Sequence, residues 1–456
     1  MKKISLWLLS ILLGMTGFAQ NEDSVFIRRL ADFILEEGKS YADLRYLTKK
    51  IGSRLSGSLG MYKAEQWGLK AMKEAGADTA WLQPCMVPHW VRGGNDYASV
   101  MVGGKKRPLD VVALGNTVGT GRPLTQPVIE IKNFEELEIK KQEVKGKIVF
   151  YNYPFNNKYI NTFHSYRDAV GYRSRGASRA AKYGAAAIII RSMTHSTDNH
   201  PHTGSTSYND SFPKIPAVAM GLQDADWLSQ TLKQKKLNVT IHTHGKFLPD
   251  TTANNVIGEL KGTVFPGEYI TIGGHLDSWD AGEGAHDDGA GCVQTIEVLR
   301  ALKALGYKPK RTIRFVLFAN EENGLRGGNK YAEEAKAKAE KHLFALESDA
   351  GGFTPLGFGF SGTDKQFQKI QAWRNLFLDY GPAVISRGGG GADIGPLART
   401  HGTAVAGLTP DSQRYFDLHN ARNDVFEAVN KRELELGAIH MAAFIYLVDK
   451  YGLDIP

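Results

Sequence analysis

The chain has 456 residues, of which 42% are hydrophobic and 23% charged, an ordinary balance for a soluble globular protein. This length exceeds what one simple core needs and predicts two domains. The formal net charge is +8, but Lys and Arg are scattered along the chain, which disfavours a nucleic-acid-binding protein. Two cysteines, Cys85 and Cys292, make no disulfide framework, and we treat both as small apolar residues.

The N-terminus has the pattern of a secretory signal peptide. Lys2 and Lys3 precede an apolar stretch, residues 4–18, which is short for a membrane span. Gly17-Phe18-Ala19 offers small residues at the cleavage site, and we expect cleavage after Ala19, so residues 1–19 form the signal peptide. We therefore predict an exported protein, periplasmic or extracellular, with no membrane association after cleavage.

The rest of the chain falls into three parts. Residues 24–76 read as amphipathic helices joined by the glycine-serine loop "IGSRLSGS". Residues 125–245 contain short apolar segments such as "GKIVFYNY" and "IPAVAM", which predict a compact β-rich unit. From residue 255 onward, strand and helix patterns alternate, and "TIRFVLFANEE" is apolar enough for a strand buried on both faces. The alternation predicts a three-layer α/β sandwich with a largely parallel mixed sheet.

The stretch "GGHLDSWDAGEGAHDDGAG", residues 273–291, gathers two histidines and five acids among glycines. Carboxylates this close together repel each other unless a positive charge lies among them. A solvated acidic loop or a calcium loop would also collect acids, but the spacing does not match the alternating EF-hand pattern that ends in Glu. We therefore interpret the stretch as part of a metal site.

The candidate ligands lie at or near the ends of expected strands, or just before the helix that follows one. In open α/β sheets, ligands bind outside the carboxyl ends of the strands, so these side chains should meet at one edge. Imidazoles and carboxylates without thiolate suit zinc, and their number exceeds what one tetrahedral ion needs. This predicts two zinc ions that share one bridging carboxylate. The candidates are His275, Asp287, Glu321, Glu322, Asp349 and His419, with Asp287 as the bridge.

Two further roles follow from position in the chain. Asp277, two residues after His275, is placed to accept the other imidazole N–H and so to fix the tautomer. Glu321 and Glu322 are adjacent, and on an extended backbone they point to opposite sides, so one should bind metal while the other faces the substrate. A carboxylate beside a zinc-bound water acts as a general base and later returns the proton to the leaving amine.

These residues resemble a known family, the co-catalytic zinc aminopeptidases and carboxypeptidases. The resemblance is carried by "GGHLDSWDAGEGAHDDGAG", "NEENG", "ESDAGG" and "RYFDLHNARND". "IGSRLSGS", "MVPHWVRG" and "RGGGGADIGP" also match its plasma glutamate carboxypeptidase (carboxypeptidase Q) branch, over nearly all of the mature chain. The resemblance implies a zinc exopeptidase-like catalytic domain, residues 20–124 and 246–456, with a protease-associated domain inserted at 125–245. It also suggests a homodimer.

The resemblance implies that His275, Asp287, Glu322, Asp349 and a late histidine are the zinc ligands, with Glu321 as the general base. This chain departs from the family at the late histidine. Relatives of this branch carry two adjacent histidines, of which the second is the ligand. Here the second place holds Asn420, and His419 lies one residue earlier. Either His419 binds the second zinc, or Asn420 serves as a weak oxygen ligand.

The glycine-rich segment "RGGGGADIGP" leaves backbone N–H groups free to approach a bound peptide. In it, Asp393 is a candidate for binding a substrate amine, and Arg387 for binding a substrate carboxylate. The sequence thus favours a secreted dizinc exopeptidase acting on dipeptides or short peptides. The alternative is a weakened or inactive binding protein with a peptidase fold, which Asn420 favours. A serine hydrolase is the least favoured, because "GFGFSG" lacks the Gly-x-Ser-x-Gly elbow.

Overall fold

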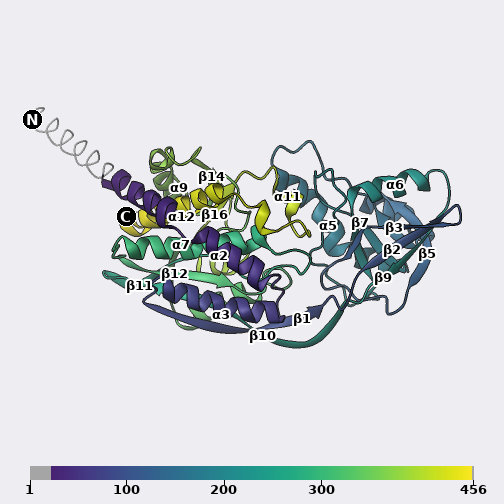
Figure 1. Cartoon of the computed structure of the whole chain (residues 1–456), viewed down its shortest axis with the longest axis horizontal. Coiled ribbons are helices and arrows are strands. Elements are labelled where there is room, and N and C mark those ends of the chain that lie inside the picture. The colour runs from purple at the N-terminus through teal and green to yellow at the C-terminus, as the bar shows by residue number, and fades with distance from the viewer. Residues whose placement is uncertain (1–21, 454–456) are drawn as a thin grey trace, which may run out of the picture.

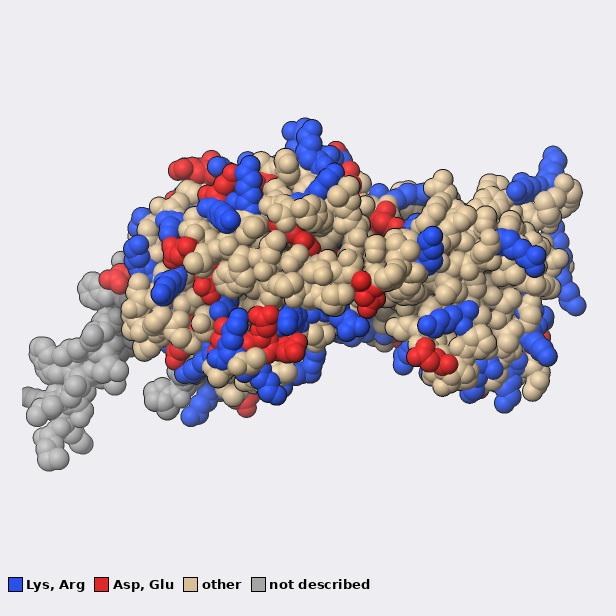
Figure 2. All heavy atoms as spheres, turned by 90° about the horizontal axis from the view of Figure 1, so that it is seen from below, with Lys and Arg blue, Asp and Glu red and all other residues tan. Residues whose placement is uncertain are grey.

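The computed structural model describes residues 22–453, so the predicted signal peptide, residues 1–19, lies outside the described part of the chain. Figure 1 shows an elongated molecule in which two units, each built around its own sheet, lie end to end. Within residues 22–453 no helix is both long and apolar enough to cross a membrane. On the face seen in Figure 2, Lys and Arg are spread over both units, with Asp and Glu among them.

The first unit contains an eight-stranded sheet in the order β1-β10-β12-β11-β13-β16-β14-β15. Its four central strands, β12, β11, β13 and β16, pair in parallel, whereas β1, β10 and β14 run antiparallel to neighbours. The expected mixed α/β sheet is therefore confirmed, with its parallel part at the centre. The strands are β1 (Thr79–Val91), β10 (Lys246–Leu260), β11 (Phe265–His275), β12 (Arg311–Phe318), β13 (Lys341–Glu347), β14 (Pro355–Ser361), β15 (Val384–Arg387) and β16 (Ala404–Pro410).

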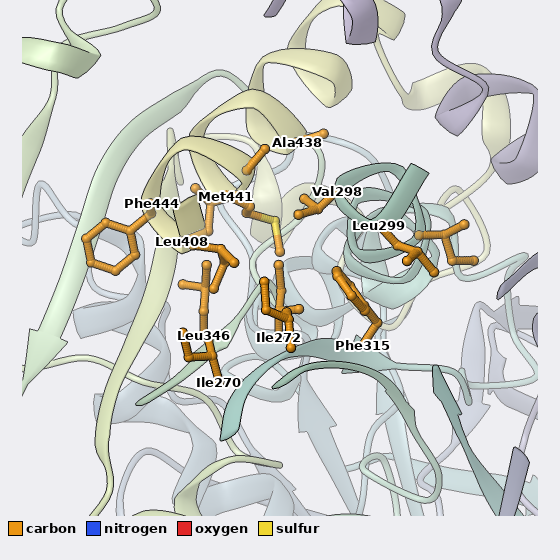
Figure 3. Packing of buried hydrophobic residues seen from close by; sticks show 14 of the residues in the cluster. Ile270, Ile272, Val298, Leu299, Phe315, Leu346, Leu408, Ala438, Met441 and Phe444 are labelled. Carbon is orange, nitrogen blue, oxygen red and sulfur yellow. The ribbon is translucent and has the colours of Figure 1, made fainter. Parts of the chain in front are cut away.

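Helices cover both faces of this sheet. Every residue of β12 is buried: Phe315 belongs to the apolar cluster that includes α7 and α12, and Phe318 to the cluster with α8 and α10. Figure 3 shows the first cluster, where Val298 and Met441 descend from their helices onto Ile272 and Phe315. On this side lie α2 (Ser40–Tyr46), α3 (Leu59–Glu74), α7 (Ala290–Ala304) and α12 (Lys431–Tyr451), and on the other α8 (Arg326–Ala337) and α10 (Gly395–His401).

Local sequence explains where these helices begin and end. The Asn430 side chain accepts hydrogen bonds from two backbone N–H groups of the first turn of α12, and Gly452 follows the last residue of that helix. The remaining helices of this unit are a helix at residues 22–37, η1 (Leu47–Ile51), η3 (Ala285–Gly289), α9 (Asp364–Gln371), η4 (Arg374–Phe377), α11 (Tyr415–Leu418) and η5 (Phe426–Ala428).

The second unit has its own eight-stranded sheet, in the order β3-β2-β9-β5-β6-β7-β8-β4. Residues 125–245 supply β5 to β9, but β2, β3 and β4 precede residue 125 and pair into the same sheet, so this sheet begins at Tyr97. The elements are β2 (Tyr97–Val102), β3 (Lys105–Leu109), β4 (Val111–Ala113), β5 (Leu124–Ile131), α4 (Phe134–Ile139), η2 (Lys141–Glu143), β6 (Ile148–Tyr151), α5 (Thr162–Ala181), β7 (Ala187–Arg191), β8 (Ala217–Met220), α6 (Leu222–Leu232) and β9 (Asn238–His242).

The long antiparallel strands β1 and β10 carry the chain out to the second unit and back (Figure 1). Arg92, just after β1, stabilises the place where these strands meet the second unit. Its guanidinium lies 2.6 Å from Asp280 and 2.8 Å from Asp96, and it donates to the carbonyl oxygen of Ala113 at 2.8 Å. Asp280 belongs to the 273–291 stretch, so this ion pair holds the second unit beside the predicted metal site.

Candidate metal centre

Three of the predicted ligands converge on one point. His275 ends β11, Asp287 lies in η3, and Asp349 comes two residues after β13. The Nε2 atom of His275 is 3.2 Å from Oδ1 of Asp287 and 3.3 Å from Oδ1 of Asp349. The three ligand atoms all lie within 4.8 Å of one another. Zinc binds nitrogen and oxygen at about 2.0–2.2 Å, so one ion fits between these atoms.

The parallel pairing of β11 and β13 explains why two of these ligands meet. Gly273 pairs with Glu347, so His275 and Asp349 each follow the paired position by two residues, at the same edge of the sheet. Gly274 lies between Gly273 and His275, where a Cβ atom would stand 2.4 Å from the carboxylate of Asp288. Only glycine leaves room for that carboxylate.

Two buried carboxylates shape the loop that carries Asp287. Asp288 accepts hydrogen bonds from the backbone N–H groups of His275 at 3.0 Å and Gly291 at 2.9 Å. Asp424 accepts from the N–H groups of His286 at 2.8 Å and Asp287 at 3.1 Å. Asp424 was not among the residues predicted from the sequence. The signal available was its place in "RYFDLHNARND", shortly after the candidate His419.

The second nitrogen of His275 has a different partner from the one expected. Its Nδ1 donates to the backbone carbonyl of Asp277 at 2.9 Å, whereas the Asp277 carboxylate is 3.7 Å away. That carboxylate instead accepts the N–H groups of Glu321 at 3.0 Å and Glu322 at 3.3 Å. The tautomer is still fixed with Nε2 free for a metal, but the carboxylate positions the two glutamates.

The electrostatics of the cluster favour a bound cation. Burial raises the pKa of Glu321 to about 8, and the carboxylate of Asp349 adds to the increase. Burial is also the largest cause of the raised pKa of Glu322 and of Asp349. A divalent cation among these groups would favour their ionised forms and reverse the increases. The donor set therefore fits a metal ion, because without one these partly buried carboxylates repel each other.

The remaining predicted ligands, Glu322 and His419, do not converge with Asp287 in the same way. His419 follows α11, and its Nε2 is 3.6 Å from Oδ2 of Asp287. Burial lowers the pKa of His419 to about 3, which keeps the imidazole neutral. Glu322 has one buried carboxylate oxygen that finds no hydrogen-bond partner among the described residues. Within residues 22–453, however, only His275, Asp287 and Asp349 bring three ligand atoms within 4.8 Å of one another. Glu322, Asp287 and His419 do not form such a group.

Asn420 has a left-handed backbone, with φ of 60°, and its carbonyl accepts the N–H of Thr203 in the second unit at 2.9 Å. Its amide satisfies its neighbours in one orientation. The Nδ2 group then donates to Oδ2 of Asp287 at 3.0 Å, and Oδ1 accepts from Arg173 at 3.2 Å. In this orientation Asn420 presents an N–H group to Asp287, whereas in the opposite one its Oδ1 faces the Asp287 carboxylate, so the oxygen-ligand alternative stays a prediction.

A cleft of about 460 Å³ opens beside these residues, between the sheet edge and the second unit. Glu321 and Glu322 lie in its wall, so the expected base faces the space that a substrate would enter. The first unit contributes Asp287, Glu321, Glu322, Asn323, Gly324, Leu325, Asp349, Tyr415, Phe416, His419 and Asn420, and the second contributes Asn116, Phe163, Tyr166, Arg173, Ser205 and Ser207. None of these residues from the second unit was predicted from the sequence to belong to the site.

The two predicted substrate-binding residues do not line this cleft. Asp393 is 1% exposed, and neither of its carboxylate oxygens has a hydrogen-bond partner within the described chain. Burial raises its pKa well above the ordinary range. Arg387 forms an ion pair with Asp364 at 2.7 Å and lies over the ring of Phe367, on the exposed end of β15.

Imidazole and carboxylate groups gathered at the carboxyl ends of parallel strands, beside a cleft, define a metal-dependent hydrolase. Residues 255–444 match the sequence profile of Peptidase family M28. The chain is 33% identical to carboxypeptidase Q of Mus musculus over 432 residues, which cover 94% of this chain and 90% of that protein. The chain belongs to Peptidase family M28, and it is a metallopeptidase.

Solved structures agree with this assignment. A Peptidase M28 precursor from Shewanella amazonensis SB2B is 31% identical and has a TM-score of 0.89, and the match covers 94% of this chain and 97% of that one. A zinc aminopeptidase from Bacillus subtilis is 20% identical with a TM-score of 0.63, over 89% of this chain and 94% of that one. The second likeness shows the fold alone.

Proposed function

We propose that the chain is an exported zinc exopeptidase that hydrolyses dipeptides or short peptides. One observation carries the proposal: a ligand set of His275, Asp287 and Asp349 lies beside a cleft that also contains Glu321. The donor types suit zinc, and relatives in Peptidase family M28 include carboxypeptidase Q. The signal peptide, a protease-associated domain in the second unit and a homodimer remain predictions that accompany the proposal.

The residues of the chain have separate tasks in the proposed reaction. Zinc held by His275, Asp287 and Asp349 would supply a polarised water as the nucleophile. Glu321 takes a proton from that water and later returns it to the leaving amine. The Asp277 carboxylate holds the backbone N–H of Glu321 at 3.0 Å, and its carbonyl keeps His275 in the tautomer that leaves Nε2 free.

The mechanism uses one zinc ion. Two ions were expected from the sequence, and the first ligand set fits an ion. Within residues 22–453, Glu322, Asp287 and His419 do not bring three ligand atoms within 4.8 Å of one another. No step is therefore assigned to a second ion. The proposal also leaves out the expected substrate contacts of Asp393 and Arg387, because neither side chain lines the cleft.

The test is a panel of dipeptides assayed with the zinc-loaded chain, with and without a chelator, while zinc is quantified in the same samples. We expect Glu321→Gln to retain its zinc and to lose about 10²–10⁴-fold in turnover, the usual contribution of a general base. Glu333→Gln, which changes an exposed glutamate on α8, is the matched control and should keep full turnover. Turnover retained by Glu321→Gln would show that another group is the base.

A second candidate function is a peptidase-fold protein that binds peptides without cleaving them. The amide of Asn420 on the shared carboxylate of Asp287 favours it, because part of the expected metal site is changed. The same panel separates the two. Binding of dipeptides by the zinc-loaded chain without any hydrolysis would favour this second function over the enzyme.

A further inference from the structure

Arg173 is a buried cation that forms no ion pair with any carboxylate in the described part of the chain. It lies on α5 of the second unit, is 8% exposed, and is absent from the ion pairs within 4.0 Å found across residues 22–453. Its guanidinium donates to the hydroxyl of Tyr166 at 2.5 Å and to the carbonyl oxygen of Thr203 at 3.4 Å. A buried charge is costly unless an opposite charge lies close enough to offset its lost hydration.

The chain makes room for this guanidinium at the cleft. Gly204 has φ of +121°, and a Cβ atom there would lie 2.3 Å from Nη1 of Arg173. The guanidinium also lies 5.4 Å from the centre of the Tyr166 ring. On the same helix Arg175 is exposed and lines no part of this cleft, so the inward direction is particular to Arg173.

The anion within reach is Asp287, and the connection is Asn420. In the amide orientation that satisfies both neighbours, Asn420 accepts from Arg173 at 3.2 Å and donates to Oδ2 of Asp287 at 3.0 Å. This oxygen is the one that a bridging carboxylate would offer to a second ion. In this arrangement Oδ2 of Asp287 accepts a hydrogen bond from the Asn420 amide, and the Arg173 guanidinium lies on the other side of that amide.

We propose that Arg173 supplies the second positive charge of this metal centre, so that the chain holds one tightly bound zinc ion where two were expected. The inference rests on the metal site in the proposed function. Four carboxylates, those of Asp287, Glu321, Glu322 and Asp349, face one dication there, and the guanidinium offsets part of the remaining negative charge. A second dication at Glu322 and His419 would be repelled by the guanidinium and would displace the Asn420 amide.

The test measures metal content and needs no substrate. The full chain is stripped with a chelator, titrated with Zn²⁺ in a calorimeter, and then dialysed and analysed for zinc by mass spectrometry. We expect one tight zinc per wild-type chain. The double variant Asn420→His with Arg173→Met restores a ligand and removes the charge, and it should hold two. Arg173→Met alone should tighten the second ion by about tenfold or more, the scale of changes beside a metal ligand.

Two further variants are the controls. Arg173→Lys keeps the charge and should remain at one zinc, and Arg175→Met removes an exposed arginine from the same helix and should also remain at one. The inference is overturned if the wild-type chain binds two ions of similar affinity, or if the double variant, with a native circular dichroism spectrum, still binds one. Because zinc is counted directly, an inactive chain with one zinc would sink the proposed function and leave this inference standing.

Discussion

Arg54 provides the sharpest test of how the metal loop is held. It is 0% exposed and lies in the loop between η1 and α3. Its guanidinium donates to the carbonyl oxygens of Leu276 at 2.7 Å, Glu283 at 2.7 Å, Gly284 at 2.9 Å and Gly52 at 3.2 Å. These bonds tie both ends of the segment that leads from β11 to the predicted ligand in η3.

Replacing Arg54 with Met should cost about 4 kcal/mol of unfolding free energy. A hydrogen bond from a charged donor contributes about 1.5–3 kcal/mol, and a buried carbonyl left without a donor costs about 1–3 kcal/mol. Four such bonds would sum to more than this. However, removing the cation also removes its own desolvation cost, and water can enter beside Glu283, which is partly exposed. The result is large for a single substitution.

The assay is urea unfolding of the zinc-loaded and the chelated chain, followed by circular dichroism. Arg45→Met is the matched control, because Arg45 is exposed on the last turn of α2, and it should change stability by less than about 0.5 kcal/mol. The loss at Arg54 should be greater with zinc bound, because zinc adds stability only where the loop is in place. If Arg54→Met stays within about 1 kcal/mol of the wild type, the hydrogen bonds do not hold the loop.

Two further predictions concern buried groups of the first unit. Burial lowers the pKa of His440 to about 4, from a value near 6.5 in the unfolded chain. Between these two pH values the unfolded chain therefore binds more protons than the folded chain. The free energy of unfolding should fall by up to about 3 kcal/mol as the pH drops from about 6.5 to 4. In His440→Gln the unfolding free energy measured with urea should depend less on pH in this range. An unchanged pH dependence would show that His440 is not its source. In Gly391→Ala the new Cβ would lie 2.0 Å from Cδ of Glu347, two residues before Asp349. Zinc affinity in a chelator competition should fall about tenfold or more, while Gly395→Ala, which meets only a flexible arginine, should not change it; equal affinities would contradict the crowding argument.

Sheet geometry explains why two of the candidate ligands lie close together. His275 ends a strand and Asp349 follows the next parallel strand, and the register of Gly273 with Glu347 makes their meeting a consequence of strand order. Periodicity and strand-end position carry that information. They do not say which atom of a residue points where. Asp277 was expected beside the imidazole, and its backbone oxygen is there, while its carboxylate turns to the N–H groups at the end of β12.

The first strands of the second sheet were harder to predict from the sequence. Its first strands, β2 and β3, form a hairpin around a two-residue turn at Gly103 and Gly104. A Gly-Gly pair between short β-prone segments is a hairpin signal. The strand β3 is "KKRPL", whose charges and proline hide the strand pattern, so the β-rich texture became visible only after residue 125.

Asn420 marks the limit of reasoning from local sequence. Its place in "LHNARND" identifies a departure from two adjacent histidines, and the local pattern offers only His419 as a substitute ligand. The group that contacts the Asn420 amide, Arg173, comes from a helix of the other unit and carries no motif of its own. A missing ligand lowers the affinity for a cation, but it leaves the negative charge of Asp287 to be neutralised. The protein can meet that requirement with a guanidinium wherever the fold brings one close, so a changed ligand and a buried arginine without a carboxylate partner have to be considered together.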